Sequence, residues 1–236
     1  AANRQSRLTF GEGHGMPSWS PDGRRVFYLK GKSGEIGIAW KLADGSGQES
    51  LFVSQAGMSN VDSWLPGGQL MASTDMKGTL DIRTIDVDGH LSTPLFADQS
   101  AAEYGASFSP DGRYIAYTSS AGGTDQVYVE TYPPGGGKWQ ISPAGGVLPL
   151  WSRDGREIYY VSDESMMAVA VDIKGVFRPG PPHVLFTGPY EIRTPPVRNY
   201  DVDSQGRFVM VKRTFVSSTP RELRMLDGWE PSAPTN

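Results

Sequence analysis

One short sequence pattern recurs along the chain at nearly constant spacing. Its clearest copy reads Ser-Phe-Ser-Pro-Asp-Gly-Arg-Tyr-Ile-Ala-Tyr at 107–117. Measured at the residue before the turn glycine, the intervals between copies are 67−22=45, 111−67=44, 154−111=43 and 205−154=51 residues. The five copies occupy residues 18–24, 63–69, 107–113, 150–156 and 201–207. A period of about 40 to 45 residues is typical of the blades of a β-propeller.

The chemistry of one copy predicts a tight hairpin. Pro110 presets the second position of a type I turn, Asp111 tolerates the third, and Gly112 supplies the permissive last position. The residues that follow the turn are β-branched or aromatic, which suits a pleated surface that is buried. These expected strands are 26–29, 114–117, 158–161 and 208–211.

Each copy is followed by further strand-like segments, which predicts four-stranded antiparallel blades. We expect third strands at 36–41, 79–85, 126–131, 167–171 and 223–226, and outer strands at 49–53, 93–96, 139–142 and 183–186. The last unit lacks an outer strand, and 7–10 is a strand-like segment without a blade of its own. The residues at 188–196 are interpreted as an inserted loop, because they contain glycine and paired prolines.

The prediction is therefore an all-β chain of class β-propeller, with residues 1–236 as a single domain. Five blades are expected, closed by pairing of 7–10 with the last blade. The alternative is a part of a six- to eight-bladed propeller.

Composition narrows the function. The chain has no cysteine, which excludes disulfides, thiolate metal sites and a cysteine nucleophile. A formal net charge of −4 and a pI near 5.4 argue against a nucleic-acid binder. No apolar run approaches the roughly 20 residues of a membrane helix, so no membrane insertion by this segment is expected.

The repeated Ser-Pro-Asp-Gly-Arg followed by an apolar strand resembles the TolB-like family of propellers, which is related to WD-type repeats. The segments 182–186 and 199–212 are similar to propellers found C-terminal to bacterial serine/threonine kinases. The resemblance implies an extracytoplasmic propeller, periplasmic or at the cell surface, that serves protein interaction or sensing. The chain departs from the pattern at 65–68, which lacks the turn aspartate, and at Arg153, which replaces the proline. The family's namesake is expected to have six blades, which supports the alternative blade number.

No catalytic or metal constellation emerges from the residues. His14, His90 and His183 lack metal-ligand spacing, and the segment 86–89 is interpreted as a turn because it lacks the remaining ligands of a calcium loop. The glycine-rich segments 11–15 and 135–138 have no phosphate-binding spacing, and no Gly-x-Ser-x-Gly motif occurs. No cofactor is expected.

Function in a propeller usually lies on loops that rigid sheets hold at one face. The segments that enter the inner strands should meet around one channel entrance and contribute His14, Asn60, Glu103, Tyr104, Leu148, Arg198 and Tyr200. Of these, the residues predicted to contact a protein or peptide partner are Glu103, Tyr104, Arg198 and Tyr200.

We favour a non-enzymatic interaction or ligand-sensing propeller. The alternative is a hydrolase or lyase whose active site is assembled in the channel from distant blades. Self-association is a further alternative for the partner.

Overall fold

The computed structural model describes residues 7–10, 13–32, 35–54, 58–68, 70–75, 79–86, 88, 90, 94–96, 100–191 and 196–212. Within these ranges the regular structure is entirely β, and no helix is present. The predicted all-β class is therefore confirmed.

The strands form sheets that follow one another along the chain. The first sheet contains β1 (His14–Trp19), β2 (Arg25–Lys32), β3 (Glu35–Leu42) and β4 (Ser50–Ser54). The second contains β5 (Met58–Trp64), β6 (Leu70–Asp75) and β7 (Asp81–Asp86). The third contains β8 (Glu103–Phe108), β9 (Tyr114–Ser119), β10 (Gln126–Thr131) and β11 (Lys138–Gln140).

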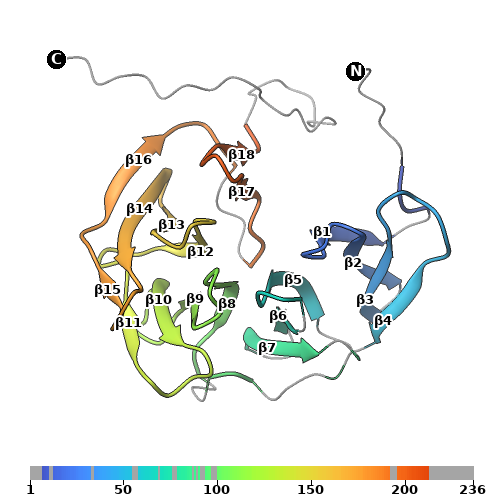
Figure 1. Ribbon diagram of the computed structural model, residues 1–236, viewed down its shortest axis with the longest axis horizontal. Helices are drawn as coiled ribbons and strands as arrows, with labels where there is room; N and C mark the ends of the chain where they lie inside the picture. Colours follow the sequence, from blue (N-terminus) through green and yellow to red (C-terminus); the bar gives the residue numbers. More distant parts are fainter. Residues whose placement is uncertain are drawn as a thin grey trace.

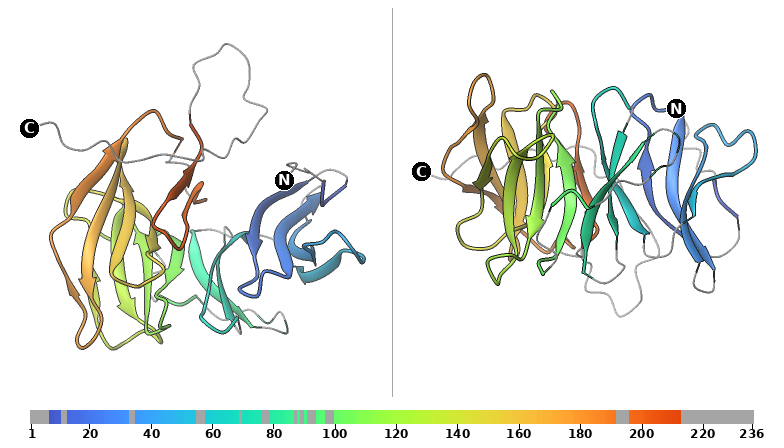
Figure 2. Two further views of the ribbon diagram at one scale, coloured as in Figure 1. Left: turned by 45° about the horizontal axis from the view of Figure 1, so that its top comes forward. Right: turned by 90° about the horizontal axis from the view of Figure 1, so that it is seen from below.

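The fourth sheet contains β12 (Val147–Trp151), β13 (Glu157–Ser162), β14 (Ser165–Asp172), β15 (Arg178–Pro179) and β16 (His183–Thr187). The fifth contains β17 (Tyr200–Val202) and β18 (Phe208–Met210). Every strand pair is antiparallel. The sheets stand side by side around a common centre, and β1, β5, β8, β12 and β17 are their inner strands (Figures 1 and 2). This is the arrangement of propeller blades.

The turn of the repeat forms the same side-chain hydrogen bonds in different sheets. In the third sheet the Ser109 hydroxyl donates to Asp111 Oδ1 over 2.7 Å and accepts from the Tyr114 amide over 3.0 Å. The fourth sheet repeats this pattern, and the bonds from the Ser152 hydroxyl and a backbone amide lower the pKa of Asp154. The turn aspartates therefore hold the hairpins closed, as the sequence predicts.

Residues of the repeat also join one sheet to the next. Ser63 Oγ accepts a hydrogen bond from the Phe108 amide at 3.0 Å, and Ser107 Oγ accepts one from the Trp151 amide at 3.2 Å. The aromatic residue of the later copy packs against the earlier sheet, as Trp151 does among the buried residues of the third sheet. The contacts between neighbouring sheets therefore recur with the same spacing as the sequence repeat.

Some predicted strands differ from the structure. The outer strand expected at 93–96 is not formed over 94–96, where one backbone bond joins the Leu95 amide to the Ile82 carbonyl at 2.8 Å. The fourth sheet has an additional short strand, β15, paired with β14. Part of the expected loop at 188–196 pairs instead with the end of the fifth sheet, through a bridge between Tyr190 and Lys212.

The predicted closure of the ring stays a prediction. Residues 7–10 are not in a strand, and Leu8 packs against Val26, Tyr28 and Ala39 of the first sheet. The expected partner strand at 223–226 lies outside the described residues. The blade number and the single-domain assignment also stay predictions.

Candidate functional site

The inner strands carry bulges at one position of the repeat. The antiparallel register shifts between Gly15 and Ser18 in β1, between 104 and 107 in β8, and between 147 and 150 in β12. Met16, Gly105 and Leu148 each lie two residues before the end of this shift, and their φ values are +52°, +65° and +57°. Bulges release backbone groups from the ladder and are frequent beside binding sites.

Leu148 shows what the bulge does in the fourth sheet. This residue is fully buried, its amide donates to Thr118 Oγ1 at 2.9 Å, and its carbonyl accepts from the Tyr200 hydroxyl at 2.5 Å. A left-handed leucine is costly, and such strain persists only where surrounding contacts maintain it. A Cβ at Gly105 would lie 3.1 Å from the Leu148 side chain, so glycine in the third sheet allows the two bulges to pack closely.

Arg198 connects sheets that are not neighbours. Its guanidinium donates to the Pro149 carbonyl of β12 at 2.8 Å and to the Asp62 carbonyl of β5 at 2.9 Å. Figure 1 shows the third sheet between the second and the fourth. The half-buried Arg198 side chain therefore binds two sheets that are not neighbours. We call Arg198, Asp62, Leu148, Pro149 and Tyr200 the Arg198 site.

Asp62 is the buried carboxyl group of this site. Burial raises its pKa from 3.8 to about 6, against the opposing effects of a 2.7 Å bond from Thr74 Oγ1, the charge of Arg198, a bond from Asn60 and the Ala106 amide. The sequence analysis missed this residue. The sequence does contain a sign of this site: Asp62 is an acidic residue within an inner strand, and the copies in the third and fourth sheets have Ala106 and Pro149 at the same position.

The four residues predicted to contact a partner lie in different environments. Glu103 is buried and accepts from the Ser119 hydroxyl at 3.2 Å, and buried Tyr104 donates to Asp125 Oδ2 at 2.7 Å. Tyr200 is buried against the Leu148 carbonyl, and Arg198 is half-buried. Tyr104 and Tyr200 share one hydrophobic cluster. Their predicted contact with a partner stays a prediction.

His14 has its own set of contacts on the first sheet. Its Nε2 lies 3.3 Å from Glu49 Oε2, and the same oxygen accepts a 2.5 Å bond from the Tyr28 hydroxyl. Lys30 pairs with the other Glu49 oxygen. Burial, followed by the effect of Glu49, raises the pKa of Tyr28 far above its ordinary value. The His14 contacts described here are therefore within the first sheet, not with the Arg198 site.

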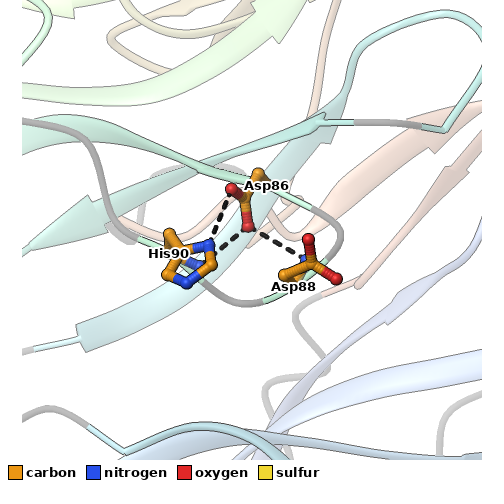
Figure 3. A group of neighbouring side chains, drawn as sticks. All are labelled: Asp86, Asp88 and His90. Atoms are coloured by element: carbon orange, nitrogen blue, oxygen red, sulfur yellow. Dashed lines mark hydrogen bonds and ion pairs between the residues drawn. The ribbon is translucent and has the colours of Figure 1, made fainter.

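Asp86, Asp88 and His90 bring three metal-ligating side chains within 4.8 Å of one another at the end of β7 (Figure 3). Asp86 Oδ1 accepts the backbone amides of Asp88 and His90 at 3.0 and 2.8 Å, and its Oδ2 lies 3.0 Å from His90 Nδ1. These bonds make the turn that the sequence predicts at 86–89.

The successive antiparallel sheets around a common centre define this protein as a β-propeller. Residues 3–176 match the family described as the TolB beta propeller domain, and the chain belongs to that family. The match ends within the fourth sheet, after β14.

Relatives support this assignment. A "Protein TolB homolog" from Chlorobium luteolum is 30% identical over 113 residues, which are 48% of this chain and 25% of the relative. The chain thus matches about a quarter of this curated relative's length. The TolB structure from Acinetobacter baumannii has a TM-score of 0.58 and 21% identity, covering 82% of this chain and 52% of that chain. The predicted similarity to kinase-associated propellers stays a prediction.

An enzyme structure shares the same fold. The periplasmic gluconolactonase PpgL from Pseudomonas aeruginosa has a TM-score of 0.56 and 16% identity, covering 92% of this chain and 76% of that chain. At this identity the likeness concerns the fold alone.

Among the described residues, no helix is long and apolar enough to cross a membrane.

Proposed function

We propose that this chain is a non-enzymatic propeller that binds a protein or peptide partner at the Arg198 site, as an extracytoplasmic interaction or sensing domain. The observation that carries the proposal is the Arg198 guanidinium, which joins carbonyl oxygens of the second and fourth sheets and is only half-buried. Membership of the TolB beta propeller domain family supports the proposal, because the resemblance to TolB-like propellers implies an extracytoplasmic domain for protein interaction.

The chemistry of the Arg198 site suits recognition of a peptide. A guanidinium has five N–H donors in a fixed plane, and the described contacts of Arg198 are two bonds to backbone carbonyls. Further donors can then serve a partner carbonyl or carboxylate. Glu103, Tyr104 and Tyr200 would act in this proposal as the wall that holds the site rigid, because their side chains are buried.

A display experiment tests this proposal. The intact protein is used to select binders from a displayed random-peptide library, and the selected peptides are measured against Arg198→Gln and against Arg207→Gln. Arg207 is an exposed turn arginine paired with Asp203 at 2.7 Å, so it controls for the loss of one positive charge. We expect Arg198→Gln to weaken binding at least tenfold and Arg207→Gln to leave it unchanged. Equal affinities for all three proteins would reject the Arg198 site.

Asp62 favours one second candidate, a lactone hydrolase of the propeller type. A carboxyl group with a pKa near 6 is suited to proton transfer at neutral pH, and one relative of this fold is a gluconolactonase. Against this role, Asp62 accepts hydrogen bonds from its own protein. Hydrolysis of gluconolactone that Asp62→Asn abolishes, in a protein that remains folded, would replace the non-enzymatic proposal.

A further inference from the structure

A cavity of about 180 Å³ opens between the first and second sheets. It lies beside the turns that follow β1 and β5, and its lining includes Asp22, Arg25, Phe27, Phe52 and Trp64. The residues of the Arg198 site do not line it. The cavity is therefore a separate candidate site, formed where the turn ends of two sheets meet.

The walls of the cavity are aromatic. Phe27 contacts Trp64 with ring centroids 4.9 Å apart and Phe52 with centroids 5.4 Å apart, and both pairs are edge-to-face. An apolar cavity of about 150 Å³ is large enough to hold a benzene molecule. This space therefore fits one apolar side chain or one small ring.

Arg25 gives the cavity a positive charge. Its guanidinium lies over the Trp40 ring, 4.4 Å from the centroid, and among the described residues no carboxylate forms an ion pair with it. A guanidinium stacked on an aromatic face keeps its N–H donors in the plane, where they can bind a carboxylate in a bidentate manner. The equivalent residues two positions after the turn glycine are Leu70, Tyr114, Glu157 and Phe208, so this arginine is particular to the first sheet.

Asp22 also lines the cavity, and its negative charge opposes the binding of an anion there. Hydrogen bonds and nearby arginines offset part of this repulsion. Asp22 Oδ1 accepts from the Ser20 hydroxyl at 2.6 Å and from the Arg24 amide at 3.0 Å, and the bond from Ser20 is the largest cause of its lowered pKa. Arg24 and Arg25 both lie near enough to stabilise this charge. Two guanidinium groups beside one carboxylate leave a local excess of positive charge.

We propose that this cavity binds a carboxylate attached to an apolar group, such as the C-terminal residue of an apolar peptide or a small aromatic acid. The apolar group occupies the space between Phe27, Phe52 and Trp64, and the carboxylate pairs with Arg25. The peptide terminus and the small acid share this chemistry, and separate ligands distinguish them.

The test compares ligands that differ only in charge. N-acetyl-phenylalanine, its primary amide and phenylacetate are titrated into the intact protein, and binding is followed through the indole resonance of Trp64, assigned with Trp64→Phe. We expect N-acetyl-phenylalanine to bind about tenfold more tightly than the amide, in line with one charge-assisted hydrogen-bonding pair. Tight binding of phenylacetate alone would identify small acids as the ligand source and would still support the site.

Variants then locate the carboxylate. Arg25→Gln should remove the preference for the acid over the amide, whereas Arg24→Gln should weaken it less, because Arg24 contributes to the local charge but does not line the cavity. Asp22→Asn, which retains an oxygen acceptor for the turn, should strengthen binding of the acid. Weaker acid binding in Asp22→Asn, equal binding of acid and amide to the unaltered protein, or no binding of any ligand would overturn the proposal.

Discussion

The raised pKa of Asp62 should be visible in how the stability of the protein depends on pH. The side chain is buried in β5, and its pKa is raised to about 6 in the folded protein. Replacing it by asparagine keeps the volume and one oxygen acceptor for the Thr74 hydroxyl but removes the ionisation. The variant loses some hydrogen bonding at every pH, so the informative quantity is the change in its stability difference with pH.

The magnitude follows from the difference between the two states. Below pH 3.8 the Asp62 carboxyl is protonated in both states, and it carries no ionisation cost. As the pH rises from 3.8 through about 6, the unfolded chain releases its proton first, so the folded protein binds more protons and its stability falls. Each pKa unit corresponds to about 1.4 kcal/mol, so the stability lost between pH 4 and pH 8 through this group is about 2–3 kcal/mol.

Urea unfolding at several pH values from 4 to 8 measures this difference directly. The free energy of unfolding of Asp62→Asn, relative to the unaltered protein, should rise by about 2–3 kcal/mol across the range. Asp154→Asn is the matched control, because hydrogen bonds lower the pKa of that turn aspartate and its linkage has the opposite sign. If the relative stability of Asp62→Asn does not change with pH, Asp62 titrates as an ordinary carboxyl and our reading of its environment is wrong.

Three further predictions concern contacts between and within the sheets. Ser107→Ala leaves the buried Trp151 amide without its acceptor, and urea unfolding should show a loss of about 1–3 kcal/mol. Gly155 and Gly206 have φ values of +71° and +78°, but only at Gly155 does an added Cβ lie within 4 Å of a neighbour, so Gly155→Ala should lower the melting temperature more than Gly206→Ala. Trp151→Ala should lower the free energy of unfolding in urea by about 3–5 kcal/mol, because Trp151 is buried. The equivalent Trp19 is 60% exposed, so Trp19→Ala should lower it far less. A comparable loss for Trp19→Ala would show that another part of the protein covers the Trp19 side chain.

The sequence predicted the parts of the fold that depend on local chemistry. The turn at 109–112 forms where the Ser-Pro-Asp-Gly pattern predicts it, and strands such as β9 and β10 begin within a residue of their expected positions. These features rest on residues within about five positions of one another, so they can be read from one copy. The prediction of an outer strand at 93–96 was wrong over 94–96, where no strand forms. A short segment at a sheet edge has few contacts that select the strand conformation.

The candidate site was less predictable, because its contacts join distant segments. The sequence placed Arg198 and Tyr200 near an inner strand, and the structure adds that they bind carbonyls of β5 and β12. No spacing within the repeat indicates that Arg198 lies beside Asp62, which is 136 residues away. The bulge at Leu148 was also missed, because a left-handed leucine has no residue signature comparable to the glycine at the same position of the third sheet.

The departures from the repeat explain where the irregular contacts occur. Pro110 of the third sheet packs 3.5 Å from the position of a Cβ on the turn glycine of the fourth, and Pro66 and Pro21 make the same contact one and two junctions earlier, respectively. Arg153 stands where this proline would join the fourth sheet to the fifth, and its Nε donates to the Val202 carbonyl at 3.3 Å. The fifth sheet packs against the fourth through the hydrophobic cluster that contains Tyr159, Tyr200 and Phe208, and Arg153 and Arg198 add hydrogen bonds at the turn and near the bulges. Because Arg198 bonds to carbonyl oxygens of β5 and β12 at the same time, a partner that engages its guanidinium would act on contacts that join sheets which are not neighbours.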